Sequence, residues 1–301
     1  MDDRVNAREL DDELQNFEAV LKSIQATPDK IPRLAGIEID GVQMPLRGTI
    51  GGDHVLYVDF NKRYDLEARI RDAEDLGQNG VAEKLELNKH RAGVLVADVS
   101  GHRATDAVIA AMLHQSFLLG TYYELDRYGE ITTRLFEHIN TRFFKSTCIN
   151  KYFTMIYGEI SNRGRFRFIT AAHPPPLVFS REYGRFMSVS PKQIVSFPPV
   201  GILPSDDDSE QRYPSLVGYK KRYTVNEINL LVPGDLLLLH TDGLSEHADG
   251  NFLVDEVEPC LAETRDESAL TICSVLAERI RHRGEPSDDI SFVVIKRTNE
   301  A

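Results

Sequence analysis

The alternation of apolar and polar residues predicts strands in several segments of the chain. In each segment, apolar side chains recur with a period of two or form a short unbroken run, and glycine, proline or charged residues bound the segment. The segments are residues 37–44, with a turn at Gly41, 55–60, 94–97, 153–160, 165–171, 177–179, 236–240 and 290–295. The run of four leucines at 236–239 indicates a buried strand.

Apolar residues at helical spacing predict an amphipathic helix at the N-terminus, over residues 6–24. Pro28 and Pro32 end this pattern, because proline removes a backbone donor and restricts the residue before it. The apolar stripe of the helix needs a partner. We therefore expect residues 1–30 to be a regulatory or dimerisation element outside the main domain, residues 31–301, although the helix could simply cap that domain's core.

Further helices are expected inside the main domain. Residues 64–86 carry many charges and are interrupted by Gly77 and Gly80, which predicts a mostly solvated helical hairpin inserted as residues 62–89. The nearly apolar stretch 104–119 predicts a buried helix, and 131–144 and 269–281 predict two more. Strands in meanders with helices in pairs are typical of an α+β fold, not of alternating βαβ units.

Composition narrows the classes of function. The chain has 301 residues, 42% hydrophobic and 27% charged, as in ordinary globular proteins. Its formal charge of −12, without a stripe of Lys and Arg, argues against nucleic acid as a partner. No apolar segment is as long as a membrane span, and the N-terminus lacks the features of a secretory signal. We expect a cytoplasmic protein without a membrane partner.

The three cysteines, Cys148, Cys260 and Cys273, are isolated and lack metal-ligand spacing. They predict neither a disulfide framework nor a nucleophile, and are interpreted as small buried side chains.

Acidic residues stand at the ends of the predicted strands. Asp98 follows the run 94–97, Asp242 follows 236–240, Asp289 precedes 290–295 beside Asp288, and Asp53 precedes 55–60. A carboxylate at such a place is unfavourable unless a cation accompanies it. The wide separations along the chain exclude a local calcium loop. The pattern therefore predicts a metal site where distant strand ends converge.

The residue types at these ends favour hard divalent cations. Mg²⁺ and Mn²⁺ prefer carboxylate, carbonyl and water oxygens, and no paired His or Cys ligands are present to favour zinc. Two such ions can activate a water and hold a phosphoryl oxygen for in-line attack. Gly52, Gly101 and Gly243 beside the acids permit tight turns at the cluster.

The ordered motifs around these acids resemble those of the SpoIIE- and RsbU-like phosphatases, a bacterial branch of the metal-dependent type-2C protein serine/threonine phosphatases. The similarity extends from about residue 31 to residue 297. The matching segments are Gly-Gly-Asp at 51–53, Val-Ala-Asp-Val-Ser-Gly-His at 96–102, Ala-Ala-His-Pro-Pro at 171–175, Pro-Gly-Asp-Leu at 233–236, Thr-Asp-Gly-Leu-Ser-Glu at 241–246 and Ser-Asp-Asp-Ile-Ser at 287–291.

The resemblance implies an α-β-β-α sandwich of two antiparallel sheets and a site for two Mn²⁺ or Mg²⁺ ions. Asp98 would bridge both ions, Asp242 and Asp288 would hold the first, and Asp53 with the backbone carbonyl of Val99 would hold the second. Asp289 is the alternative member of its pair. In the family, activated water attacks phosphoserine or phosphothreonine directly, without a phosphoenzyme.

Two residues beside the acids complete the candidate catalytic set. His102 could protonate the leaving serine oxygen, although the favoured interpretation of His102, as of His173, is a loop side chain bonded to the backbone. Arg103 stands where the family usually has glycine, and could clamp the substrate phosphate or neutralise excess acid. Ala172 likewise replaces a family glycine, which would stiffen that turn.

The leading hypothesis is a metal-dependent protein serine/threonine phosphatase. By resemblance, its substrate would be a phosphorylated regulator such as a STAS-type anti-sigma-factor antagonist, with an upstream activator protein and a homodimer through the N-terminal helix as further expectations. A phosphatase-like binding module without hydrolysis is the alternative, which Arg103 keeps open. A nucleotide cyclase is disfavoured, because no phosphate-cradling loop accompanies Gly51 and Gly52.

Overall fold

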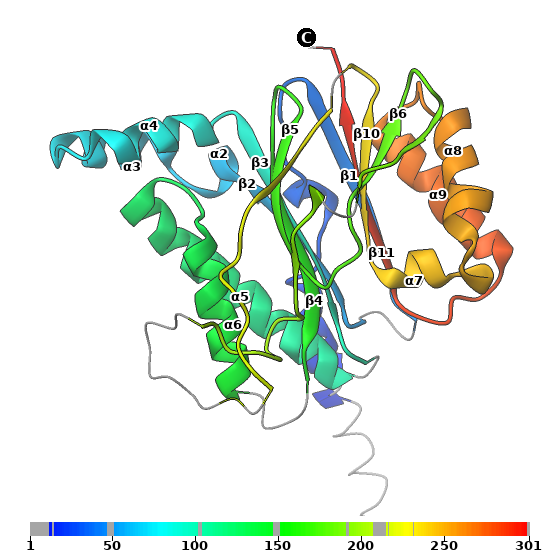
Figure 1. The fold of residues 1–301 in the computed structure, drawn as a ribbon, viewed down its shortest axis with the longest axis horizontal. Coiled ribbons are helices and arrows are strands. Elements are labelled where there is room, and N and C mark those ends of the chain that lie inside the picture. Colours follow the sequence, from blue (N-terminus) through cyan, green and yellow to red (C-terminus); the bar gives the residue numbers. More distant parts are fainter. Residues whose placement is uncertain are drawn as a thin grey trace, which may run out of the picture.

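Two β-sheets pack face to face with helices on both outer sides in the computed structural model of the chain (Figure 1). The structure describes residues 12–13, 15–46, 51–101, 104–146, 151–190, 193–206, 215, 217–230 and 232–299. The strands are β1 (Ile37–Met44), β2 (Asp53–Asp59), β3 (Arg91–Val99), β4 (Phe153–Ser161), β5 (Arg165–Ala171), β6 (Leu177–Ser180), β7 (Arg185–Met187), β8 (Ser196–Phe197), β9 (Asn226–Asn229), β10 (Leu236–His240) and β11 (Ile290–Arg297).

The helices follow the strands in two groups. They are α2 (Phe60–Arg63), α3 (Leu66–Asp75), α4 (Asn79–Asn88), α5 (Ala104–Tyr128), α6 (Thr133–Ser146), α7 (Asp242–Glu246), α8 (Glu258–Glu263) and α9 (Ala269–Arg283), with short turns η1 (Pro28–Lys30), η3 (Ala248–Gly250) and η4 (Leu253–Val257). Helices α2 to α6 lie on one side of the sandwich, and α8 and α9 lie on the other (Figure 1). No helix among these described segments is long and apolar enough to cross a membrane.

The predicted α+β sandwich is confirmed. One sheet has the order β1-β11-β10-β6-β7 and the other β2-β3-β4-β5-β8, with β9 also paired to β5. All described strand pairs are antiparallel except the short pair of β5 and β8, which is parallel. The second sheet is thus mixed where two purely antiparallel sheets were predicted.

Strand alternation divides the core into three layers. Val55, Val96, Leu237 and Val293 lie between the two sheets. The opposite face of the β2–β5 sheet packs on α3 to α6, and the opposite face of the β10–β11 sheet packs on α8 and α9. Successive side chains of a strand point to opposite faces of the sheet. The position of a polar residue at a strand end, odd or even along the strand, therefore decides whether it faces the space between the sheets.

Gly41 does not form the predicted turn, because β1 continues straight through it. A Cβ atom at Gly41 would lie 2.4 Å from Tyr57 Oη and 2.8 Å from the carbonyl oxygen of Phe292. The glycine is therefore required by close packing between the sheets, not by a change in chain direction.

The N-terminal segment is helical over the described residues 12–13 and 15–22. Leu21 is buried and Phe17 half-buried, whereas Val20 is 66% exposed. The last turn of this helix therefore packs on the main domain, and whether the helix regulates or dimerises the protein stays a prediction.

The predicted helical hairpin within residues 62–89 forms as α3 and α4, which project from the body of the protein (Figure 1). Leu66, Ile70 and Leu85 nevertheless join the core beneath them. Cys260 and Cys273 are free and buried, as expected, and Cys148 lies outside the described residues.

Candidate active site at the strand ends

Two of the predicted ligands lie on neighbouring strands of the second sheet. Asp53 begins β2 and lies directly opposite Asp98 of β3, which in turn lies opposite Thr154 of β4. All three share the face that carries Val55 and Val96 farther along these strands, so they line the space between the sheets. The two carboxylates are therefore brought together by register, as the sequence predicted.

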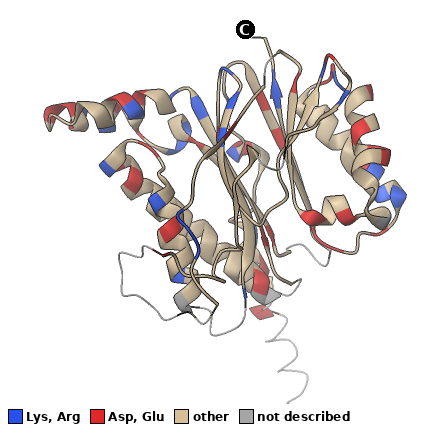
Figure 2. Cartoon of the chain, viewed as in Figure 1, with Lys and Arg blue, Asp and Glu red and all other residues tan. Residues whose placement is uncertain are grey.

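The first sheet contributes polar residues to the same mouth of the sandwich. Thr241 follows β10, and its hydroxyl donates a hydrogen bond of 2.8 Å to Asp53 Oδ2. The Thr241 Oγ1 atom also accepts from the backbone N–H of Ser291 at 3.0 Å. This side chain therefore joins the two sheets beside the acids, and Asp242 follows it as the first residue of α7. Figure 2 shows the acidic residues of α7 beneath the ends of the strands.

Mutual repulsion and burial change the acidity of these carboxyls. Burial, followed by the charges of Asp242, Asp288 and Asp289, raises the pKa of Asp98 to about 7. Burial, with the charge of Asp98 next, also raises the pKa of Asp53 well above its usual range, against the hydrogen bond from Thr241. Carboxyls from four separate strand ends thus influence one another.

Asp289 is buried and already fully engaged by backbone donors. Its Oδ1 accepts from the N–H of Leu46 at 2.6 Å, and its Oδ2 from the N–H of Gly52 at 2.7 Å. Asp288 is half-buried, and its Oδ1 accepts from the N–H of Asp289 at 2.6 Å. The two acids of the pair therefore differ: Asp289 fixes the segment before β2, whereas the Asp288 carboxylate accepts a local bond from the next residue.

Glycines allow the segments around the acids to approach closely. A Cβ atom at Gly51 would lie 2.4 Å from the Asp289 carboxylate, and one at Gly243 would lie 2.0 Å from the carbonyl oxygen of Asp289. A Cβ atom at Gly52 would lie 2.9 Å from the carbonyl oxygen of Val99. That carbonyl therefore borders the residue just before Asp53, close to where it was predicted to act as a ligand.

The donors at these strand ends fit a hard cation by their chemistry, since all are carboxylate or carbonyl oxygens. Their mutual repulsion is what a divalent cation would relieve. Among the residues that the structure describes, however, no three His, Cys, Asp or Glu side chains lie close enough together to hold an ion as they stand. The acids converge on one region without forming a closed cage, so binding of an ion would require their side chains to move closer.

An ion pair that the sequence did not predict supports the turn after Asp98. Lys151 Nζ lies 2.7 Å from Asp106 Oδ1 and donates to the carbonyl oxygen of Ser100 at 2.6 Å. The Asp106 side chain is fully buried at the start of α5, whereas that of Lys151 is 25% exposed. A lone acid in the otherwise apolar stretch 104–119 was the signal for this pair. Gly101, with φ of 117°, lets the turn pass between the two side chains.

Family comparison comes from a sequence model and from solved structures. The model described as Stage II sporulation protein E (SpoIIE) matches residues 88–298, which is more than half of the chain. The chain belongs to the SpoIIE family. It is therefore of the type-2C serine phosphatase class, and the match contains Asp98, Asp242, Asp288 and Asp289. Asp53 precedes the SpoIIE match.

A curated relative agrees with the SpoIIE assignment. Phosphoserine phosphatase RsbP of Bacillus subtilis is 26% identical over 214 residues, which cover 70% of this chain and 47% of that protein. The chain thus spans about half the length of this curated relative.

Solved structures show the same fold. The RsbU and RsbW domains of Rv1364c from Mycobacterium tuberculosis align with a TM-score of 0.62 at 20% identity, covering 90% of this chain and 62% of that one. The SiaA-PP2C domain of Pseudomonas aeruginosa aligns with a TM-score of 0.63 at 12% identity, covering 97% and 98%.

The structure describes only one of the three remaining candidate residues in the SpoIIE motifs, His173. His102 and Arg103 lie outside the described residues. His173 is buried, and its Nδ1 lies 2.9 Å from the hydroxyl of Thr154, the residue opposite Asp98. Burial lowers the pKa of His173 to about 3, so its ring is neutral at physiological pH and contributes no positive charge to the site.

Proposed function

We propose that this member of the SpoIIE family is a Mn²⁺- or Mg²⁺-dependent protein serine/threonine phosphatase. The convergence of carboxyls from distant strand ends carries the proposal. Burial, followed by the charges of Asp242, Asp288 and Asp289, raises the pKa of Asp98 to about 7, although these acids lie more than 140 residues from Asp98 in the sequence. An acidic cluster of this kind suits a reaction that needs divalent cations and an anionic phosphoryl group at one place.

The proposed ligands follow from the geometry of the strand ends together with the family resemblance. Asp98 would bridge two ions, Asp242 and Asp288 would hold the first, and Asp53 with the carbonyl of Val99 would hold the second. We assign Asp288, and not Asp289, because both oxygens of Asp289 accept backbone hydrogen bonds. Asp289 would instead fix the segment that leads into β2.

Ions bound there would activate a water for attack on phosphorus and offset the charge of the phosphoryl group. The protein's own residues orient this site. Thr241 holds the Asp53 carboxylate by its hydrogen bond, and the Lys151–Asp106 pair holds the turn that follows Asp98. His102 is proposed to protonate the leaving oxygen, and Arg103 to contact the phosphate.

The substrate is proposed to be a phosphorylated regulatory protein of the anti-sigma-factor-antagonist type. RsbP is named a phosphoserine phosphatase, and the Rv1364c structure joins an RsbU domain to an RsbW domain. The exposed part of the N-terminal helix is proposed to serve an activating partner or a second copy of the chain. Deletion of residues 1–30 tests this role, and unchanged oligomeric state and activity would refute it.

Hydrolysis of p-nitrophenyl phosphate and of a phosphoserine peptide tests the activity. Activity should require added Mn²⁺ or Mg²⁺, disappear with a chelator and be lost in Asp98→Asn. Asp266→Asn, at the opposite end of the sandwich, is the matched control and should keep full activity. Turnover that needs no metal, or full activity of Asp98→Asn, would refute the proposal.

A further inference from the structure

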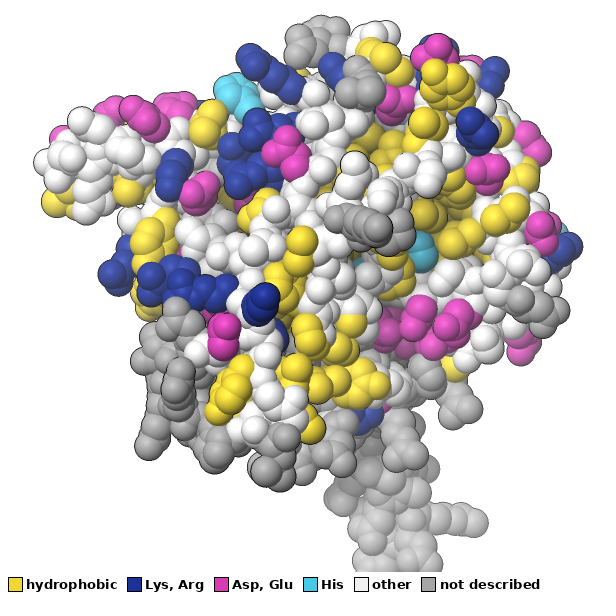
Figure 3. Space-filling view, in the orientation of Figure 1, with side chains coloured by type: hydrophobic (Ala, Val, Ile, Leu, Met, Phe, Trp, Pro, Cys, Tyr) yellow, Lys and Arg dark blue, Asp and Glu magenta, His cyan; other side chains and the backbone are white. Residues whose placement is uncertain are grey.

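Basic residues surround a cavity of about 420 Å³ at the end of the second sheet that lies opposite the acidic cluster. The cavity lies where β3 begins, where the β4–β5 hairpin turns and where β5 begins. Its charged lining consists of His90, Arg91, Glu159, Arg163, Arg165 and Arg167. Figure 3 shows Lys and Arg side chains gathered beside a histidine in the upper left of this face, next to the α3–α4 hairpin.

The acids nearby balance only part of this positive charge. Arg91 lies 3.6 Å from Glu159, and Arg165 lies 3.0 Å from Glu227. Within the described part of the chain, neither Arg163 nor Arg167 forms a hydrogen bond or an ion pair within 4 Å, although the charge of Arg167 acts on Glu159. In a chain of net charge −12, two guanidinium groups that make no hydrogen bond or ion pair therefore line one cavity.

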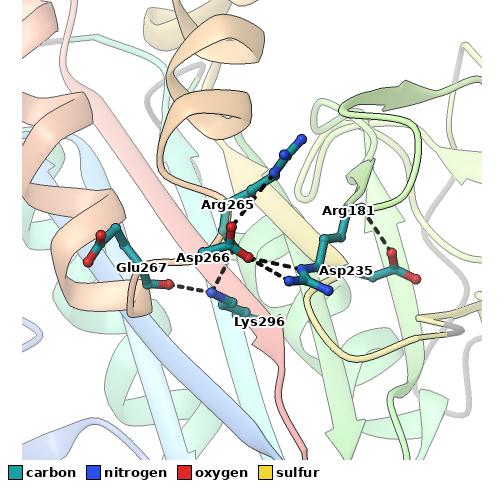
Figure 4. A network of polar contacts seen from close by, with 6 residues as sticks. All are labelled: Arg181, Asp235, Arg265, Asp266, Glu267 and Lys296. Carbon is teal, nitrogen blue, oxygen red and sulfur yellow. Dashed lines mark hydrogen bonds and ion pairs between the residues drawn. The ribbon is translucent and has the colours of Figure 1, made fainter.

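A larger polar cavity of about 810 Å³ lies where β10 begins and β11 ends, and its charged residues, unlike Arg163 and Arg167, pair with one another (Figure 4). There Arg181 lies 2.7 Å from Asp266, and Lys296 donates to the carbonyl oxygen of Arg265 at 2.9 Å. Asp235 accepts the backbone N–H of Arg181 at 3.2 Å. Those charged groups already have partners within the protein, so that cavity offers no comparable excess of positive charge.

A second, smaller cavity of about 170 Å³ adjoins the arginine cavity and shares Glu159 and Arg167 with it. Phe136, Tyr157 and Ile131 line it together with Glu130, whose carboxylate lies 2.7 Å from Lys84 Nζ. The Tyr157 hydroxyl donates to Glu159 Oε1 at 3.1 Å, which fixes the boundary between the two cavities. The combined space has a cationic end and an aromatic, less polar end.

We propose that the two cavities form one binding site for a small molecule that carries a phosphate group. Arg163 and Arg167 would take the phosphate, since guanidinium groups bind phosphate oxygens in bidentate fashion. A flat, less polar part of the ligand would lie toward Phe136. The volume is in the range of small-molecule sites, roughly 300–1,000 Å³, and too small for a folded partner.

This site is separate from the proposed phosphatase centre. Arg91 and Asp98 stand at opposite ends of β3, and seven residues of strand span about 23 Å. The inference therefore does not depend on the phosphatase proposal, and a binding test can be made without metal or catalysis.

Calorimetric titration with AMP in a chelating buffer tests the site, with adenosine as the probe that lacks the phosphate. AMP should bind with a Kd below about 1 mM, and adenosine should bind at least about tenfold more weakly. The double variant Arg163→Gln/Arg167→Gln should weaken AMP binding at least about tenfold, because it removes two charge-assisted contacts. Arg281→Gln, an exposed arginine on α9, is the matched control and should bind AMP as the wild type does.

Asp98→Asn, a variant of the proposed phosphatase centre, should leave AMP binding to the arginine cavity unchanged in the same titration. The affected arginines are exposed or half-exposed, so the double variant should unfold at the wild-type temperature. Equal AMP affinity of the wild type and the double variant would overturn the proposal. Loss of binding in Asp98→Asn, or no measurable heat with AMP, would overturn it as well.

Discussion

Replacement of Asp98 by Asn should stabilise the metal-free protein at alkaline pH while abolishing its activity. Asp98 is half-buried, and burial with three neighbouring acids raises its pKa to about 7 from the usual 3.8. Ionisation is therefore harder in the folded state than in the unfolded state. The wild type should lose stability as the pH rises from about 4 to about 7, because the unfolded chain releases this proton first.

The size of the effect follows from the two pKa values of Asp98. Their difference corresponds to at most about 4 kcal/mol at pH 8, since one pKa unit equals about 1.4 kcal/mol. Relaxation of the site reduces this value, so we expect Asp98→Asn to be about 2–4 kcal/mol more stable than the wild type at pH 8 and nearly equal to it at pH 4. Asparagine keeps the shape of the side chain and removes only the ionisable group.

Urea unfolding from pH 4 to pH 8 in a chelating buffer measures this difference. Asp266→Asn, distant from the cluster, should show no comparable gain at alkaline pH. Added Mn²⁺ should stabilise the wild type and have a much smaller effect on Asp98→Asn. A variant that is less stable than the wild type at pH 8, or a stability difference that does not change with pH, would show that ionisation of Asp98 does not destabilise the folded protein.

Three further substitutions test how the site and the core are held together. Lys151→Met should raise the Mn²⁺ concentration for half-maximal activity and lower kcat about tenfold, because the turn after Asp98 loses its ion pair. Lys151→Arg should retain most activity, and identical Mn²⁺ titrations of Lys151→Met and Lys151→Arg would contradict this. Gly41→Ala should lower the free energy of unfolding by about 1–3 kcal/mol, since the added Cβ would meet Tyr57 Oη at 2.4 Å. Gly80→Ala is the control, because nothing lies within 4 Å of a Cβ atom at that position. Equal losses of stability in the two variants would contradict the packing at Gly41. Thr241→Val should lower the free energy of unfolding in urea by about 1–3 kcal/mol, because the Ser291 N–H and the Asp53 carboxylate lose their partner. Unchanged stability would show that the Thr241 hydroxyl does not help to hold the two sheets together.

Much of the architecture could be predicted because the longer strands have apolar side chains at regular spacing. The short strands β7, β8 and β9 were not predicted, since each has at most two apolar side chains, whereas the equally short β6 has a run of three. The helix predicted to end at 119 continues to Tyr128, because buried Leu125 extends its packing beyond two exposed tyrosines, Tyr122 and Tyr123. Gly41 was misinterpreted because sequence alone does not distinguish a glycine required by a turn from one required by a close neighbour.

The acids of the proposed site could be located from their positions at strand ends, but the different contacts of these acids could not. Asp289 and Asp288 are adjacent and identical in type, and only the structure shows that Asp289 accepts two backbone hydrogen bonds. The pairing of Lys151 with Asp106 depends on which strand lies beside the turn, which no local pattern specifies. Register and tertiary contact, not residue type, decide these assignments.

Anomalous diffraction from crystals soaked in Mn²⁺ would test directly whether the acids at the strand ends bind two ions, because it locates the ions without reference to activity. Two peaks are expected at the mouth of the sandwich, one between Asp98, Asp242 and Asp288 and one between Asp98, Asp53 and the carbonyl of Val99. Crystals that show no peak there, or peaks only elsewhere on the protein, would rule out a two-metal site at these acids.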